Sequence, residues 1–131
     1  MDENIKLSLT SLISDLYFMS ESEYPFTIEE VEYKNIHEIE KSILSNYDST
    51  VTILRIETQE FFNKIINNFE SAEDDLSQLF AKKYRELYQF IIQSCKSTIV
   101  LKCGKIEVGV YIILEMKNES FLLLKTISVE T

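Results

Sequence analysis

The chain has 131 residues, the length of one ordinary domain, and its 45% apolar and 27% charged residues are typical of a globular protein. Thirteen basic and 22 acidic residues give a formal net charge of −9, which disfavours nucleic acid or an anionic membrane as a direct ligand. No apolar run approaches the roughly 20 residues of a membrane span, and the acidic N-terminus is not typical of a secretory signal. We therefore expect a single cytoplasmic domain over residues 1–131, monomeric until it meets a partner.

The first predicted element is a helix over residues 3–19, and a strand follows over residues 26–33. Apolar side chains at three- and four-residue steps indicate the helix, namely Ile5, Leu9, Leu12, Leu16 and Met19. Because Pro25 forces the residue before it into an extended conformation, the helix should end near Ser20. The strand mixes β-branched and aromatic residues with glutamates, which predicts an edge position in a sheet.

A short helix and a buried strand are predicted next. Asn35 and Glu38 have the spacing of a capping pair and open the helix, which continues to Leu44. Residues 51–56, "VTILRI", have the apolar and β-branched composition of a buried strand.

Two more helices are predicted in the second half of the chain. Thr58 can cap the first, whose apolar side consists of Phe61, Phe62, Ile65, Ile66 and Phe69. Ser71 and Asp74 again have capping-box spacing, and they open the longest helix, which reaches about Cys95.

Three strands close the chain, at residues 97–103, 105–116 and 121–129, and their short connections predict antiparallel neighbours. Apolar residues alternate onto both faces of these strands, so both faces must be covered. The sequence therefore predicts an α+β fold, a three-layer α/β/α sandwich with a mostly antiparallel sheet.

No catalytic centre can be assembled from the sequence. His37 has no spacing that brings it to Cys95 or Cys103, two glycines cannot form a phosphate-binding loop, and acid pairs such as Glu21 and Glu23 are common on an acidic surface. The two cysteines are consistent with reduced, buried thiols or, less simply, with a disulfide across a helix-to-strand turn. We expect a binding protein without a cofactor, and a metal-dependent hydrolase that uses these carboxylates is the remote alternative.

A resemblance makes this expectation more specific. The segment "LYFMSESEYPF", residues 16–26, resembles the signature segment of the bacterial nuclease A inhibitor family. The stretches "GKIEVGVYIILEMKN" and "SFLLLKTISVET" resemble the closing strands of the same family, and residues 61–62 and 81–83 align between the two ends.

The resemblance implies both a fold and a function. The family inhibits sugar-nonspecific nucleases of the ββα-metal type, and its fold is similar to that of plant pathogenesis-related proteins. By resemblance, Glu21 meets an arginine in the active site of the nuclease, and Thr131 reaches the region of its catalytic Mg²⁺ as a ligand to the partner's metal. An acidic loop offers carboxylate oxygens where the nuclease binds phosphate oxygens.

The family carries an interface tryptophan just before its long helix, and in this sequence Ser71 falls near that place, with Phe69 or the acids at 73–75 as candidate substitutes. The candidate partner-binding residues are the loop set Glu21, Ser22, Glu23 and Tyr24, the set before the long helix, Ser71, Glu73 and Asp74, and the terminal Thr131.

The charge distribution leaves a second function open. Residues 21–48 contain eight acids and two bases, which predicts one strongly negative edge. The alternative is therefore an acidic interaction domain of the same fold that binds a different basic partner, with Glu29, Glu30 and Glu32 as its main contacts.

Overall fold

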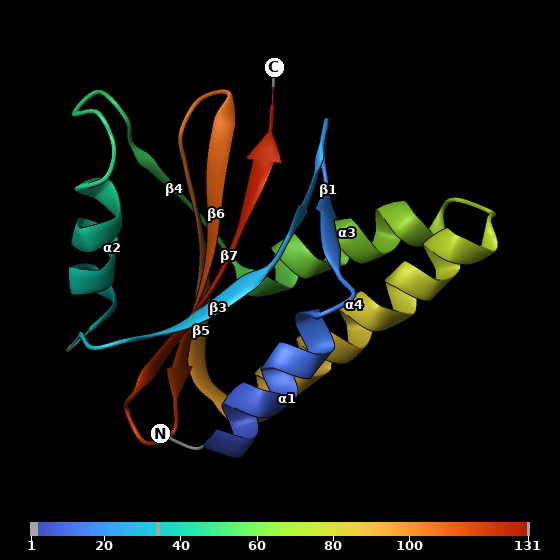
Figure 1. The fold of residues 1–131 in the computed structure, drawn as a ribbon, viewed down its shortest axis with the longest axis horizontal. Coiled ribbons are helices and arrows are strands. Elements are labelled where there is room, and N and C mark those ends of the chain that lie inside the picture. Colours follow the sequence, from blue (N-terminus) through green and yellow to red (C-terminus); the bar gives the residue numbers. More distant parts are fainter. Residues whose placement is uncertain (1–2, 34, 131) are drawn as a thin grey trace.

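The computed structural model describes residues 3–33 and 35–130, which form four helices and seven strands (Figure 1). The helices are α1 (Glu3–Ile13), α2 (Ile36–Leu44), α3 (Thr58–Glu70) and α4 (Asp75–Ser94). The strands are β1 (Tyr17–Met19), β2 (Glu23–Pro25), β3 (Thr27–Val31), β4 (Ile53–Ile56), β5 (Cys95–Cys103), β6 (Glu107–Met116) and β7 (Phe121–Val129).

Five of these strands form an antiparallel sheet in the order β3-β7-β6-β5-β4, while β1 and β2 pair separately as a hairpin. Helices α1, α3 and α4 cover one face of the sheet, and α2 covers the other (Figure 1). The α+β class and the two covered faces of the sheet are confirmed. The edge position predicted for β3 is confirmed as well, because β3 pairs with β7 at one end of the sheet.

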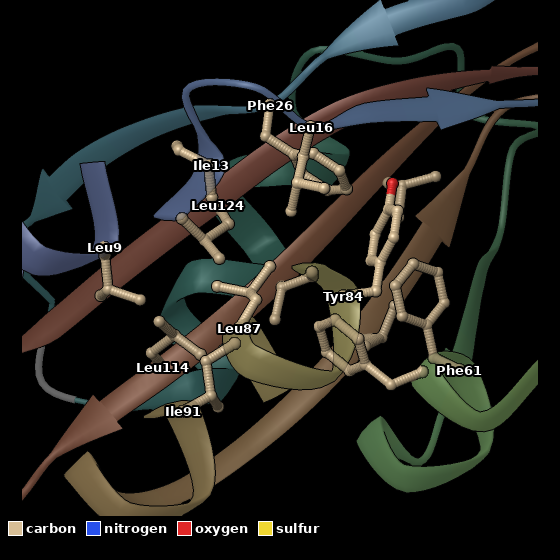
Figure 2. Close-up of a cluster of buried hydrophobic side chains, with 14 of the residues drawn as sticks. Leu9, Ile13, Leu16, Phe26, Phe61, Tyr84, Leu87, Ile91, Leu114 and Leu124 are labelled. Atoms are coloured by element: carbon tan, nitrogen blue, oxygen red, sulfur yellow. The ribbon is translucent and has the colours of Figure 1, made fainter. Parts of the chain in front are cut away.

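The side chains of β6 point alternately into two hydrophobic cores, one on each face of the sheet. Val110, Ile112 and Leu114 are fully buried in the larger core, under α1, α3 and α4 (Figure 2 shows part of it). Tyr111 and Ile113 point the opposite way, into the smaller core beneath α2. Each large apolar side chain buried in this way stabilises the fold by about 1.5–3 kcal/mol, so these side chains help to hold both helical layers on the sheet.

The predicted first helix is too long. It ends at Ile13, where the Ser14 hydroxyl donates a hydrogen bond to the Ser11 carbonyl at 2.8 Å, and residues 17–19 form β1 instead. Leu16 is fully buried while Met19 is 46% exposed, so the apolar pattern here has the period of a strand. The three-residue spacing of Leu16 and Met19 is that of a helix, but here it does not reflect helical structure.

The prediction of a buried strand over residues 51–56 is wrong in its burial. The strand is β4, and it forms the edge of the sheet opposite β3. Leu54 is 59% exposed, because among the described residues β4 is hydrogen-bonded to β5 alone.

The predicted cap of α2 is confirmed, whereas the predicted caps of α3 and α4 are wrong. Asn35 caps α2 as expected, through its side chain and the Glu38 amide. Thr58 is not a cap: it is the first residue of α3, and its hydroxyl accepts a hydrogen bond from Thr98 at 2.7 Å.

The Ser71–Asp74 capping box is also wrong. Ser71 ends α3, and Asp74 caps α4 by accepting a hydrogen bond from the Ser77 amide at 2.9 Å. Hydrogen bonding from the Ser77 side chain, together with that from the Ser77 amide, holds the pKa of Asp74 below its usual value.

The two cysteines lie at opposite ends of β5, about 26 Å apart for a strand of this length. Within the described structure both thiols are free, and burial raises the pKa of Cys95 to about 11. The disulfide interpretation is therefore wrong, and Cys95 stays protonated near neutral pH.

One buried carboxylate fastens α2 to the edge of the sheet. Glu40 is 7% exposed, and it accepts hydrogen bonds from Arg55 on β4 at 2.8 Å (Nε to Oε1) and 2.5 Å (Nη2 to Oε2). The hydrogen bonds from Arg55 hold the pKa of Glu40 below its usual value, despite the opposing effect of burial.

We predict that Glu40→Gln lowers the free energy of unfolding by about 1–3 kcal/mol near pH 7, because Arg55 loses its charged acceptor. Since the folded-state pKa of Glu40 is lowered, the stabilisation is complete above the ordinary carboxyl pKa and is lost as the pH falls through the folded value. Urea unfolding should therefore show a gap between wild type and variant that shrinks as the pH falls below the ordinary carboxyl pKa. Glu32→Gln, which changes an exposed acid, is the control, and a gap that does not vary with pH would contradict the assignment.

Candidate functional site

The acidic segment after α1 forms the tip of the β1–β2 hairpin. Phe18 pairs with Tyr24, Met19 pairs with Glu23, and the Ser20 amide donates to the Ser22 carbonyl at 2.9 Å to close the turn. The loop predicted from the sequence is therefore a tight turn that projects Glu21 at its apex.

The base of the hairpin is anchored in the larger core. The Phe18 ring stacks on Phe61 of α3 at 5.9 Å, with the ring planes only 3° apart. Tyr84 of α4 is a fully buried side chain of this core (Figure 2). Its hydroxyl donates to the Tyr17 carbonyl at 2.6 Å. Burial raises the pKa of Tyr84, so its hydroxyl keeps the proton that this hydrogen bond needs.

The tip of the hairpin lies against the C-terminal end of β7 (Figure 1). The Val129 amide donates to Ser20 Oγ at 2.9 Å, and the Glu21 amide donates to the Val129 carbonyl at 3.3 Å. Residues near the two ends of the chain, 109 positions apart, therefore form one continuous surface.

Glu130 continues this surface and is held on several sides. Its carboxylate accepts hydrogen bonds from Lys102 Nζ at 2.6 Å and from the Ser128 hydroxyl at 2.8 Å, and its amide donates to the Ile106 carbonyl at 2.8 Å. The hydrogen bond from Lys102 is the main reason that the pKa of Glu130 lies below its usual value. Thr131, the next residue, lies outside the described residues.

An open groove of about 960 Å³ runs between the hairpin, α3 and the end of β7. Apolar and aromatic side chains line its interior, including Phe18, Ile56, Phe61, Ile65 and Phe69. Charged residues also border it, namely Glu21, Glu60, Lys64, Lys102 and Glu130. An apolar groove with charges of both signs around it can accept part of a protein partner beside the acidic tip.

The structure brings only part of the predicted site together. Glu21 borders the groove, Ser22 and Glu23 are exposed beside it at the tip, and Tyr24 is half-buried in β2. The set Ser71, Glu73 and Asp74 lies at the exposed α3–α4 turn and does not line the groove.

The predicted substitute for the tryptophan, Phe69, is partly committed to packing. It is half-buried and stacks on Tyr84 at 5.8 Å, while its remaining surface lines the groove near Ser77. The α3–α4 turn and the hairpin tip are therefore two separate candidate contact regions.

The sequence did not reveal the residues that hold the tip and the end of β7. From the sequence, Ser20 marks only the expected end of the first helix, because nothing local signals its bond to Val129. Lys102 lies on β5 and Glu130 directly follows β7, and they are 2.6 Å apart only because of the order in which the strands pair. The sequence does not reveal that order.

Among residues 3–33 and 35–130, no group of three or more His, Cys, Asp and Glu side chains is placed to hold a metal ion. Within the same residues, no helix combines the length and the apolar character needed to cross a bilayer.

Comparison with known protein families matches residues 3–131 to the family described as nuclease A inhibitor-like protein. No curated protein matches the chain.

We predict that Tyr84→Phe destabilises the protein by about 1 kcal/mol, because the Tyr17 carbonyl loses a short hydrogen bond inside the structure. Chemical denaturation measures the loss, and Tyr88→Phe, which removes a neighbouring hydroxyl with no hydrogen bond in the described part of the chain, is the control. Equal stability of the two variants would show that the hydroxyl of Tyr84 does not anchor the hairpin.

We also predict that Lys102→Met raises the pKa of Glu130 toward that of an ordinary glutamate, because its main hydrogen-bond donor is removed. In the wild type, the contact with Lys102 is lost as the pH falls through the lowered pKa. Carbon-detected NMR titration of the Glu130 carboxyl measures both effects. A titration midpoint that is identical in the two proteins would contradict the assigned contact.

Proposed function

The chain belongs to the nuclease A inhibitor-like family, and we propose that it inhibits a sugar-nonspecific DNA/RNA endonuclease of the ββα-metal type by occupying its active-site cleft. The observation that carries the proposal is the contact of Ser20 and Glu21 with Val129. Two segments that must enter one cleft together lie side by side at the surface.

The charge of the tip suits such a cleft. A nuclease binds a polyanionic strand with cations and a metal ion, so its cleft attracts negative charge. Glu21 and Glu23 are exposed at the apex of the hairpin, and the net charge of −9 also speeds encounter with a positive surface. The tip therefore supplies carboxylate oxygens in place of phosphate oxygens.

We assign separate tasks to the two ends of this surface. Glu21 pairs with an arginine of the cleft, where a charge-assisted hydrogen bond is strong and directional. Thr131, which follows the firmly held Glu130, supplies oxygens toward the nuclease Mg²⁺ directly or through water. Ser22 and Tyr24 complete the contact around Glu21.

The α3–α4 turn is proposed as a second, outlying contact. Ser71, Glu73 and Asp74 are exposed there, away from the groove, so they would meet the nuclease outside its catalytic centre. Their loss should affect affinity less than the loss of Glu21 does.

A second candidate function is favoured by the edge strand β3. Glu29 and Glu30 are exposed on this strand, and Glu30 lies 3.8 Å from Lys6. If the protein binds a different basic partner through this edge, charge reversal at Glu29, Glu30 and Glu32 will weaken binding more than Glu21→Ala does.

The test is an inhibition assay with a purified sugar-nonspecific ββα-metal nuclease. We expect Glu21→Ala to cost about 2–4 kcal/mol of binding, mainly through faster dissociation, because the partner's arginine loses the carboxylate with which it pairs. Glu86→Ala, which removes an equal charge from the exposed side of α4, should leave inhibition unchanged. If the wild-type protein at micromolar concentration inhibits no nuclease of this type, the proposal is overturned.

A further inference from the structure

On its outer edge, the C-terminal end of β7 is hydrogen-bonded to the tip of the β1–β2 hairpin instead of to a neighbouring strand. Residue pairing between β3 and β7 ends at Thr27 and Lys125, so Val129 has no strand neighbour on that side among the described residues. Its amide and its carbonyl are nevertheless both hydrogen-bonded, to Ser20 Oγ at 2.9 Å and to the Glu21 amide at 3.3 Å. The Ser20 hydroxyl thus stands where the carbonyl of a neighbouring strand would stand.

The opposite side of the same segment is bonded to the sheet. The Glu130 amide donates to the Ile106 carbonyl at 2.8 Å, which follows from the alternating direction of backbone groups along an extended chain. The end of β7 is therefore held from both sides, by the main sheet and by Ser20 with Glu21.

Ser20 also determines the shape of the turn. Its hydroxyl donates to the Ser22 carbonyl at 3.3 Å, and its amide donates to the same carbonyl at 2.9 Å. One hydroxyl therefore links the geometry of the turn, and with it the direction of Glu21, to the position of Val129.

The remaining anchors of the hairpin lie at its base. Phe18 packs on Phe61, Tyr84 binds the Tyr17 carbonyl, and the Thr126 hydroxyl donates to the Pro25 carbonyl at 3.0 Å. Loss of the Ser20 hydroxyl should therefore release the tip while the hairpin and the fold remain.

We propose that Ser20 is a positioning residue that locks the acidic tip to the C-terminal end of β7, so that Glu21 and the chain end meet a nuclease as one preorganised surface. The consequence for binding rests on the proposed inhibitor function. Preorganisation matters here because two contact segments that move independently lose conformational freedom when they enter one cleft. A hydroxyl at position 20 is the required chemistry, which threonine keeps and alanine removes.

The first measurement needs no nuclease. Amide hydrogen exchange, followed by NMR, reports whether the Val129 amide is bonded. We expect exchange at Val129 to quicken about tenfold in Ser20→Ala and to return toward the wild-type rate in Ser20→Thr. Ser11→Ala, at an exposed serine of α1, is the matched control and should leave it unchanged. An unaltered Val129 rate in Ser20→Ala overturns the inference, whatever the protein inhibits.

The second measurement is a double-mutant cycle on inhibition. Ser20→Ala should raise the inhibition constant about tenfold, and Glu21→Gln should have a smaller effect in the Ser20→Ala background than in the wild type. Strictly additive effects would overturn the claim that Ser20 acts through Glu21, even if Val129 exchange responds as expected. If the wild type inhibits no nuclease, the proposed function fails and the binding consequence fails with it, and the exchange data then decide only whether the lock exists.

Discussion

The hydroxyl of Tyr84 needs a hydrogen-bond partner inside an apolar core. The partner that it finds joins the helical layer to the hairpin. A buried hydroxyl without a partner costs about 1–3 kcal/mol, and here the partner is the Tyr17 carbonyl at 2.6 Å. The rings of Phe26 and Phe69 pack against Tyr84, so the donor has little freedom to turn elsewhere. The base of the hairpin is thus fixed by the core, and its tip by the end of β7.

Much of the fold follows from local patterns in the sequence. The C-terminal strands were predictable because short turns separate them and because apolar side chains occupy both of their faces, as Tyr111 and Ile112 illustrate. The end of α1 was not predictable, since the spacing of Leu16 and Met19 fits a helical stripe, and only the structure shows that the first is buried and the second exposed. The exposure of Leu54 depends on the order of strands, which no local pattern contains.

The candidate site was predictable only in part, and for a related reason. Glu21 was identified from a resemblance over a short segment, and chain composition alone would have left it as a solvated acid. Its neighbour across space, Val129, could not be identified, because 109 positions separate that residue from Ser20. The start of α4 shows the same limit over a shorter distance. Ser71 and Asp74 have the spacing of a capping box, but Ser71 ends α3 and Asp74 caps α4.

The contact between the hairpin tip and Val129 also protects the sheet. An unpaired strand edge is a template on which another chain can add a strand, and beyond Lys125 the outer edge of β7 has no partner from β3. The hairpin covers that edge: Ser20 and Glu21 bond the Val129 amide and carbonyl, and the Thr126 hydroxyl donates to the Pro25 carbonyl. A second molecule can extend the sheet there only by displacing the hairpin, so the segment that presents the acidic tip also guards the protein against self-association.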